Sequence, residues 1–480
     1  MRRQWFGAAL AGMMFVAGCG DGSESSKAST SKGDANTSKG ADGSDASTVK
    51  LPPCPVKAAD GKTVTVKLWH SLQRANEDGI KELVKRFEAA NPNITIELTA
   101  LGTYDALLTK WRSGLEGNGD LPDAVQLEDK NVQLAADLDA VLPMQSCVNA
   151  DTFDLKQLNQ RAVDFLTIDK VMYGMPFNLS NPVLYYDKTD FKAAGLDPEK
   201  PPTTLDGILD AAKKLKDSGI AEPLSFETDA WYLEQWRALS NKLFVDHDNG
   251  RNGRATKVAF DDAEGKAVFE WAGKLHDAKI SSAYPVDGFE HLLALGNGTA
   301  SMTIDSSTVL GTALPLLNGH GLADKEIELG VAALPSVNSD RSGGVTAGGA
   351  NMYIMKNAAP EKQAAAYTFL KYLTSAESQA WWSAQTGYLP VNVASQDDAT
   401  LKAALEATPV YKVAPKQLAD SPSGPATAGI ALGAYPEVRD AISEGLTKVI
   451  NEGADPAATL ADVVRKSNAA IADYNQRLGL

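Results

Sequence analysis

The chain has 480 residues, and its 61 Asp and Glu outnumber its 46 Lys and Arg, which gives a formal net charge of −15 at pH 7. A negative charge of this size argues against a nucleic-acid partner and against an anionic lipid surface. The length is sufficient for two or three domains.

The first residues have the pattern of an export signal. Arg2 and Arg3 precede a short apolar segment, residues 6–18, and this segment is shorter than the roughly 20 residues that a spanning helix needs. The "VAGC" that closes it resembles the lipobox of bacterial lipoproteins, in which the chain is cut before the cysteine and the thiol is lipid-modified. We therefore expect a signal peptide over residues 1–18 and a lipid on Cys19. An ordinary signal peptide that contains a cysteine is the alternative.

A polar segment follows Cys19. Residues 20–50 are almost all Gly, Ser, Thr, Ala, Asp, Lys and Glu, without an aromatic residue, so we expect residues 19–58 to form a disordered tether after the lipidated cysteine. The two remaining cysteines, Cys54 and Cys147, either pair in an oxidising compartment or stay free thiols. They are too few and too far apart for a structural zinc site.

Motifs for catalysis and cofactors are missing from the sequence. It has no Walker A sequence, no G-x-G-x-x-G after a strand, no H-E-x-x-H and no G-x-S-x-G. The five histidines show no metal-ligand spacing, and carboxylate pairs are unavoidable among so many acidic residues. We expect no cofactor, no metal and no enzyme activity.

The early part of the globular region predicts a β-α-β unit. Residues 63–71 alternate like a strand, residues 76–90 have helical apolar spacing, and residues 94–98 form a second strand. This order predicts a parallel α/β sheet, whose ligands bind beyond the carboxyl ends of the strands. Trp69 and Ser71 lie where the first strand should end. Another strand, within residues 123–129, ends in Glu128 and Asp129.

Further elements follow in chain order. Residues 172–196 predict an extended segment, a strand and the start of a helix, and residues 201–219 predict a helix capped by Thr204. Residues 298–308 are strand-like. We expect one long helix over residues 360–385 and mostly helix over residues 435–478.

Four segments carry a family resemblance: "LWHS" with a helix ending "RFEAANPN"; "YGMPFNLSNPVLYYDKTDFKAAGLDPEKPPTTLD"; "GTASMTIDSS"; and the segment from "GGANMYIMKN" to "SAQTGYLPV". In these segments the chain resembles the extracellular solute-binding proteins of bacterial ABC importers, family 1, in the cluster that binds sugars and polyols. "WHSL", "PFNLSNPVLYYDK", "GGANMYIM" and "GAYPEVRD" are most similar to the glycerol-3-phosphate and glycerophosphodiester branch.

The resemblance implies an α/β fold of the type II periplasmic-binding-protein class. It has two lobes, each a mostly parallel sheet flanked by helices, with the ligand cleft between them. We assign residues 59–173 and 302–346 to the first lobe and residues 174–301 and 347–480 to the second. The chain should cross between the lobes near residues 173–175, 301–303 and 346–348.

Candidate ligand-binding residues follow from chemistry and from the resemblance. Aromatic rings stack on sugars or attract quaternary ammonium groups, and hydroxyl and carboxylate groups pair with ligand hydroxyls. The aromatic candidates are Trp69, Tyr104, Trp231 and Tyr388, for each of which core burial is the alternative. The polar candidates are Ser71, Glu128, Asp129, Ser180, Ser306 and Ser307. For a phosphate, the resemblance implies Gly348, Gly349 and Arg439, and the alternative for Arg439 is a solvated or salt-bridged residue.

The resemblance implies a binding lipoprotein without catalysis. The lobes would close on a small polar solute and deliver it to the permease of an ABC importer, which has a separate ATPase. We expect an exported monomer, held to the membrane by its lipid alone, on the periplasmic or cell-surface side. Glycerol-3-phosphate or a glycerophosphodiester is the favoured solute, and a neutral sugar or oligosaccharide is the alternative. A secreted glycoside hydrolase that uses Glu128 or Asp129 is an outside alternative. Arg439 would favour a phosphate if it faces the cleft and a sugar if it points to solvent.

Overall fold

The computed structural model describes residues 50–286, 288–311 and 327–480. The predicted signal peptide, the lipid site at Cys19 and most of the predicted tether lie outside these residues. The tether was expected to reach residue 58, but Cys54 is buried and disulfide-bonded to Cys147 on α4 (Met144–Ala150). The ordered fold therefore begins before residue 58. Within the described part of the chain, no helix is both long and apolar enough to cross a membrane.

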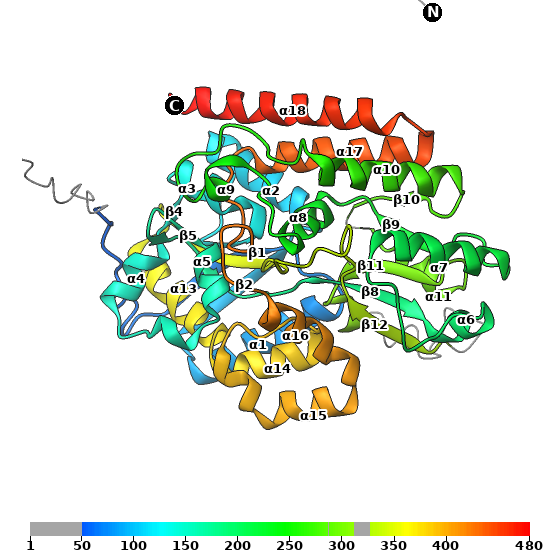
Figure 1. The fold of residues 1–480 in the computed structure, drawn as a ribbon. Helices are drawn as coiled ribbons and strands as arrows, with labels where there is room; N and C mark the ends of the chain where they lie inside the picture. Colours follow the sequence, from blue (N-terminus) through cyan, green and yellow to red (C-terminus); the bar gives the residue numbers. More distant parts are fainter. Residues whose placement is uncertain (1–49, 287, 312–326) are drawn as a thin grey trace, which may run out of the picture. The chain divides into compact units, whose positions relative to one another are not determined.

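The first of two large sheets has the strand order β2-β1-β3-β13-β4, and β7 also pairs with β13 (Figure 1). Its strands are β1 (Val64–His70), β2 (Ile94–Ala100), β3 (Ala124–Glu128), β4 (Val141–Leu142), β7 (Met175–Pro176) and β13 (Ala350–Met355). β2, β1 and β3 are parallel, whereas β13 runs antiparallel to β3, β4 and β7. The predicted β-α-β unit and the strand before Asp129 are confirmed.

The second sheet has the order β10-β9-β11-β8-β12. Its strands are β8 (Pro182–Asp187), β9 (Leu224–Glu227), β10 (Ala283–Tyr284), β11 (Met302–Ser306) and β12 (Leu329–Ala333). β10, β9 and β11 are parallel, and β8 runs antiparallel to both β11 and β12. Each large sheet therefore combines three parallel strands with antiparallel ones. A small separate pair is formed by β5 (Thr167–Ile168) and β6 (Val171–Met172).

The sheets divide the chain differently from the expected lobe boundaries at residues 302 and 347. β11 and β12 belong to the second sheet, and β13 belongs to the first. The predicted crossing at residues 301–303 is also wrong, because this stretch leads into β11 and is fully buried. The physical reason is that a buried strand such as β11 fits the middle of either sheet, and only its neighbours decide which one it joins.

The chain passes between the sheets in segments that lie side by side. Ser180 and Gly348 exchange backbone hydrogen bonds of 3.0 and 2.9 Å, and the Leu389 amide donates to the Leu179 carbonyl at 2.7 Å. The crossing after β7 therefore lies at residues 177–181, just beyond its predicted place. The crossing predicted at residues 346–348 coincides with the second segment. These hydrogen bonds join the crossings into a narrow, strand-like connection.

The helices cover the faces of the sheets (Figure 1). They are α1 (Ala75–Ala90), α2 (Tyr104–Ser113), α3 (Val132–Asp137), α5 (Gln160–Phe165), α6 (Lys188–Ala193), α7 (Leu205–Asp217), α8 (Ala230–Leu239), α9 (Asp246–Gly250), α10 (Ala263–Asp277), α11 (Glu290–Gly296), α13 (Pro360–Leu373), α14 (Ala376–Thr386), α15 (Ala399–Ala407), α16 (Val413–Asp420), α17 (Tyr435–Glu452) and α18 (Pro456–Arg477), besides α4. The Thr204 cap is confirmed, since its hydroxyl accepts from the Gly207 amide at 3.1 Å. The long helix expected over residues 360–385 is two helices, because Ser375 caps the start of α14.

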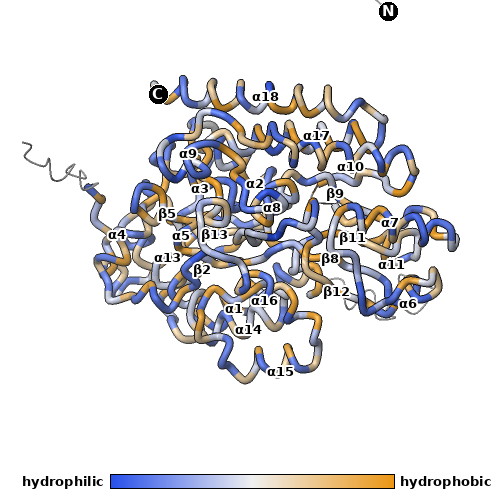
Figure 2. The backbone as a smooth tube through the Cα atoms, in the orientation of Figure 1, coloured by the Kyte–Doolittle hydropathy of each residue, from blue (hydrophilic) through white to orange (hydrophobic). Residues whose placement is uncertain are grey.

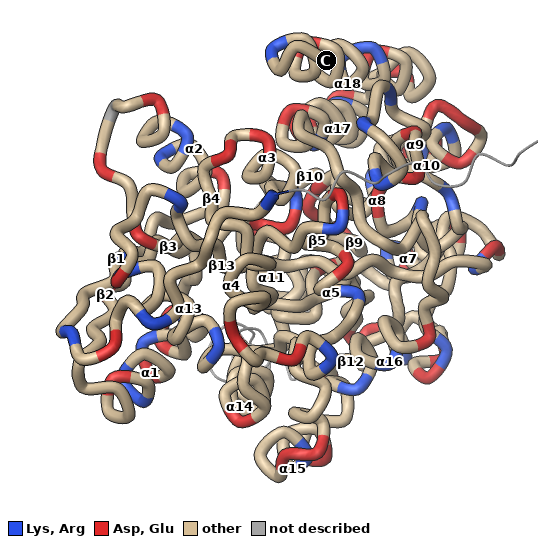
Figure 3. The backbone as a smooth tube through the Cα atoms, turned by 90° about the vertical axis from the view of Figure 1, so that its left-hand side faces the viewer, with Lys and Arg blue, Asp and Glu red and all other residues tan. Residues whose placement is uncertain are grey.

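Hydropathy and charge follow this arrangement. Apolar and polar residues alternate along α10, α17 and α18, which pack on one another (Figure 2). The buried apolar residues of α1 are Ile80, Leu83, Val84 and Phe87, which is the spacing that the sequence predicted. Acidic and basic residues are interspersed over the backbone (Figure 3).

Removal of the disulfide should destabilise the fold. The bond closes a loop with a sequence separation of 93 residues. In the chain-entropy model a loop of that size stabilises the folded state by about 4 kcal/mol, and measured values are often nearer 2. We expect C54A/C147A to lose about 2–4 kcal/mol of unfolding free energy in urea titrations. An unchanged denaturation midpoint would contradict this expectation.

Candidate functional site

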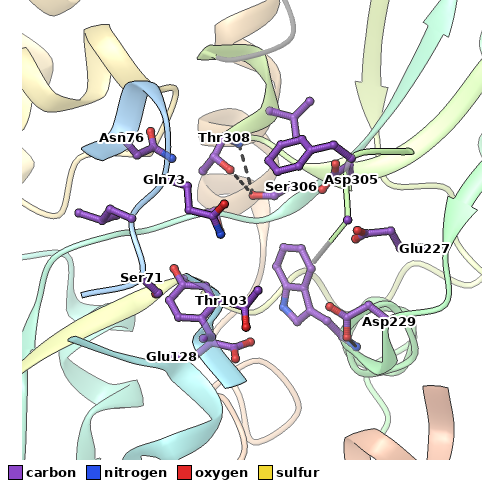
Figure 4. A pocket seen from close by; sticks show the side chains of 18 of the residues that line it. Ser71, Gln73, Asn76, Thr103, Glu128, Glu227, Asp229, Asp305, Ser306 and Thr308 are labelled. Atoms are coloured by element: carbon purple, nitrogen blue, oxygen red, sulfur yellow. Dashed lines mark hydrogen bonds between the residues drawn. The ribbon is translucent and has the colours of Figure 1, made fainter. Parts of the chain in front are cut away.

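A cavity of about 220 Å³ lies where strands of both sheets end. Ser71 follows β1, Glu128 closes β3, Glu227 closes β9, and Asp305 and Ser306 close β11. Figure 4 shows Ser71, Gln73 and Glu128 on one side of this space and Glu227, Asp229 and Asp305 on the other. The cavity is smaller than the roughly 300–1,000 Å³ typical of pockets for drug-sized ligands. It therefore suits a small solute.

The lining is rich in acidic and aromatic side chains. The acidic ones are Glu128, Asp129, Glu227, Asp229 and Asp305, and the aromatic ones are Tyr104, Trp231, Tyr232, Phe289 and Tyr388. Among the described residues that line the cavity, Arg74 is the one lysine or arginine. Its guanidinium carbon lies 3.7 Å from the centre of the Phe289 ring. The cleft is thus suited to hydroxyl groups and to cations, while a multiply charged anion would face repulsion.

Two glycines fix the wall behind the aromatic residues. Gly348 lies against the indole of Trp231, and a Cβ added there would come within 2.6 Å of the ring carbon Cζ2. Gly349 has a φ of +121°, and a Cβ at that position would clash with the carbonyl oxygen of Asn178. Glycine is required at both positions by the close approach of the crossing segments. Gly349 lines the cavity, whereas Gly348 supports Trp231.

Arg439 on α17 is buried behind the cavity wall and does not line it. Its Nε and Nη2 donate to the two carboxylate oxygens of Glu234 on α8, at 2.7 and 2.8 Å. Its Nη1 donates to Glu128 at 2.8 Å, and Nη2 also donates to Asp129 at 3.2 Å. The guanidinium therefore joins carboxylates from the end of β3 to a carboxylate that follows β9. The prediction that Arg439 reaches a ligand phosphate does not match this placement, and the salt-bridged alternative does.

The buried carboxyl groups of this network titrate abnormally. Burial is the main cause that raises the pKa of Asp129 to about 7; Arg439 opposes this rise, and the neighbouring Glu128 and Glu234 add to it. Burial likewise raises the pKa of Glu234 and of Asp229. Glu128 has a second cation, since its Oε2 lies 2.8 Å from the Lys130 ammonium. The wall of the cleft thus holds one carboxyl group, that of Asp129, with a pKa near neutrality.

Most of the residues predicted from the sequence meet at the cavity. Its lining includes Ser71, Tyr104, Glu128, Asp129, Ser180, Trp231, Ser306, Gly349 and Tyr388. Three other candidates lie elsewhere, besides Arg439. Trp69 is buried in the first sheet, and the ammonium nitrogen of Lys110 lies 5.0 Å from the centre of its ring. Ser307 borders a neighbouring apolar cavity, and Gly348 lies beneath Trp231. Trp69 points away because alternate residues of a strand face opposite sides.

Several lining residues were missed at the sequence level. Glu227 and Asp229 follow β9 just as Glu128 and Asp129 follow β3, so the same strand-end argument would have found them in "LSFETDAW". Asp305 lies near the end of the strand-like residues 298–308, so the strand-end argument applies to it as well. No sequence pattern identifies Arg74 and Phe289 as lining residues, because only the folding of the chain brings them together.

Comparisons with known proteins agree with this geometry. A family model described as bacterial extracellular solute-binding protein matches residues 82–409. The sn-glycerol-3-phosphate-binding periplasmic protein UgpB of Escherichia coli K12 is 28% identical over 412 residues, which covers 84% of this chain and 92% of that protein.

Solved structures show the fold. UgpB from Mycobacterium tuberculosis, in complex with glycerophosphocholine, is similar with a TM-score of 0.73 and 21% identity, over 86% of this chain and 99% of that one. The cyclic alpha-maltosyl-1,6-maltose binding protein from Arthrobacter globiformis has a TM-score of 0.66 and 25% identity, over 85% and 99% of the two chains. The predicted two-lobed type II periplasmic-binding-protein fold is confirmed.

Loss of Arg439 should destabilise the protein strongly. Arg439→Met leaves the buried Glu234 and Asp129 without their cation, and removing one partner of a buried ion pair costs about 3–5 kcal/mol. The measurement is the unfolding free energy from urea titrations. Arg465→Met, at an exposed ion pair with Asp462 on α18, is the matched control and should change little. Equal stabilities of the two variants would contradict the structural role of Arg439.

The contribution of Asp129 to the stability should fall as the pH rises toward neutrality. With a folded-state pKa of about 7 against an ordinary value of 3.8, Asp129 keeps its proton in the native state over a range where the unfolded chain has lost it. This contribution is complete below the ordinary pKa and is lost as the pH rises through the folded one. The side chain of Asp129→Asn cannot ionise. Between about pH 4 and pH 7 the unfolding free energy of this variant should therefore fall less than that of the wild type, and the two falls should differ by at least about 1 kcal/mol. Asp420→Asn, an exposed exchange on α16, should retain the wild-type slope. Parallel curves for Asp129→Asn and wild type would contradict the prediction.

Proposed function

Because the chain belongs to the family of bacterial extracellular solute-binding proteins, we propose that its cleft binds a glycerophosphodiester with a cationic head group, such as glycerophosphocholine, for uptake by an ABC importer. The acidic, aromatic lining of the cavity carries this proposal. A quaternary ammonium group is attracted both to aromatic faces and to carboxylates. The relatives named above bind glycerol-3-phosphate and glycerophosphocholine, which supports this class of solute.

The charge balance of the cleft distinguishes between the phosphate ligands. Arg439 is already paired with Glu234, Glu128 and Asp129, and Arg74 remains as the cation in the lining. A phosphate monoester carries nearly two negative charges at neutral pH and would meet an acidic lining in which Arg74 is the one lysine or arginine among the described residues. A diester carries one negative charge, which a quaternary ammonium head group offsets. We therefore favour the diester over glycerol-3-phosphate.

Arg74 and its neighbours supply a place for the phosphate group. Arg74 precedes the first turn of α1, where the helix dipole is positive, and Gln73 and Asn76 also line the cavity. The Trp231 ring and the carboxylate of Asp229 would then receive the cationic end. Arg74 comes from the first sheet's side and contacts Phe289 from the second's, so a solute that binds Arg74 beside this contact favours lobe closure.

A neutral sugar is the second candidate. Carboxylates pair well with sugar hydroxyls, and the neutralisation of Arg439 removes the cation that a phosphate was expected to use. The similarity to the maltose-type binding protein of Arthrobacter globiformis agrees with this reading.

The remaining parts of the proposal concern the setting of the protein. We propose an exported, monomeric lipoprotein that is anchored through Cys19 and delivers its solute to permease subunits coupled to a separate ATPase. The lipobox-like "VAGC" and the periplasmic relatives support export. No catalytic step is part of the proposed role.

Calorimetric titration tests the solute. We expect glycerophosphocholine to bind at least about tenfold more tightly than glycerol-3-phosphate, which is about 1.4 kcal/mol, and maltotriose not to bind. Binding should also decrease the radius of gyration measured by X-ray scattering, because the lobes close. Trp231→Ala should weaken glycerophosphocholine binding by about tenfold or more.

Trp381→Ala is the matched control for the tryptophan. Its ring lies 4.3 Å from the guanidinium carbon of Arg86, outside the cavity lining, so its loss should leave the affinity unchanged. Tight binding of glycerol-3-phosphate with weaker binding of the diester would contradict the charge argument. Binding of maltotriose alone would replace the proposal with the sugar candidate.

A further inference from the structure

A histidine and two carboxylates form a buried cluster in the wall of the cleft. Glu227 closes β9 and Asp305 lies on the adjacent parallel strand β11, while His291 comes from α11 and is 1% exposed. Ligand atoms of the three residues all lie within 4.8 Å of one another. Figure 4 shows Glu227 and Asp305 on the same side of the cavity. This cluster could not be read from the sequence, because His291 lies 14 residues before Asp305 and 64 after Glu227, which is no recognised metal-ligand spacing.

The hydrogen bonding of His291 defines its tautomer. Its Nε2 lies 2.7 Å from Oδ2 of Asp305, and a carboxylate only accepts, so Nε2 carries a proton. In the neutral ring, Nδ1 then presents a lone pair. Nδ1 has no hydrogen-bond partner among the described residues, and it lies 3.6 Å from Oε1 of Glu227. A buried ring nitrogen that presents a lone pair and has no donor beside it is left unsatisfied, and a bound cation would satisfy it.

The 3.6 Å separation fits a metal ion that binds both atoms. Zn²⁺ binds histidine nitrogen and carboxylate oxygen at about 2.0–2.2 Å, and a tetrahedral angle places two such ligand atoms about 3.4 Å apart. Asp305 would hold the imidazole in the correct tautomer, which is the usual role of a carboxylate behind a metal-binding histidine.

We propose that Nδ1 of His291 and the carboxylate of Glu227 bind a divalent transition-metal ion, Zn²⁺ by preference, with Asp305 as the residue that positions His291. A nitrogen and an oxygen donor suit Zn²⁺ better than Ca²⁺ or Mg²⁺, which prefer oxygen alone. Because Glu227 also lines the cavity, the remaining coordination positions are accessible from the cleft. A bound dication would offset part of the negative charge there. This site departs from the expectation that the protein holds no metal.

Metal titration of the purified, metal-stripped protein tests the site without any solute, so the result is independent of the proposed function. We expect one Zn²⁺ per chain by calorimetry and by metal analysis after dialysis. His291→Gln and Glu227→Gln should each weaken this binding by at least about tenfold, and Asp305→Asn by about ten- to a hundredfold through the histidine.

His247→Gln is the matched control. His247 is exposed, and its Nε2 lies 3.7 Å from Oδ2 of Asp246, so it is also a histidine beside a carboxylate. Its exchange should leave Zn²⁺ binding unchanged. Circular dichroism checks that each variant is folded. If His291→Gln fails to fold, Co²⁺ is added to the wild-type protein as a second test. We then expect the visible absorption spectrum of tetrahedrally coordinated Co²⁺.

Two results would overturn the proposal. The first is the absence of stoichiometric Zn²⁺ binding by the wild type, which would mean that a proton on Nδ1 is the cation between His291 and Glu227. The second is wild-type affinity in folded Glu227→Gln or His291→Gln, which would place the metal elsewhere.

Discussion

One buried guanidinium holds together carboxylates that come from both sheets of the fold. Glu128 and Asp129 are brought to Arg439 by the end of β3, and Glu234 is brought by the helix that follows β9. Desolvation of three carboxylates is costly unless a cation with several donors satisfies them, and the planar arginine fork does so. The arrangement at the back of the cleft depends on this pairing, because without it the carboxyl groups would repel one another or take up protons.

This pairing decides what the cleft offers to a solute. The cation that a phosphate would otherwise use already satisfies carboxylates, so the face toward the cavity stays acidic, with Arg74 at its edge. Aromatic rings and carboxylates then become the main recognition groups, and the charge of the solute matters more than its bulk. Gly348 has a part in this, because it allows the Trp231 indole to lie flat against a crossing segment.

Strand ends were the most informative feature of the sequence. The β-α-β pattern placed Ser71, Glu128 and Asp129 at the correct edge of a sheet, since parallel strands end together whatever their partners. The same pattern did not reveal which sheet β11 joins, because strand pairing is a long-range property. For a similar reason it did not show that Arg439 pairs with three carboxylates. The orientation of Trp69 is instead a local property, because alternate residues of a strand face opposite sides. Electrostatic partners that are hundreds of residues apart become visible only in the fold.

The disulfide between Cys54 and Cys147 determines where mechanical load enters the fold. Any pull on the N-terminal segment reaches α4, next to the first sheet, before it reaches β1. In a reducing medium this covalent link would be lost, and the packing of Val56 and Ala59 against the core would then hold the segment before β1.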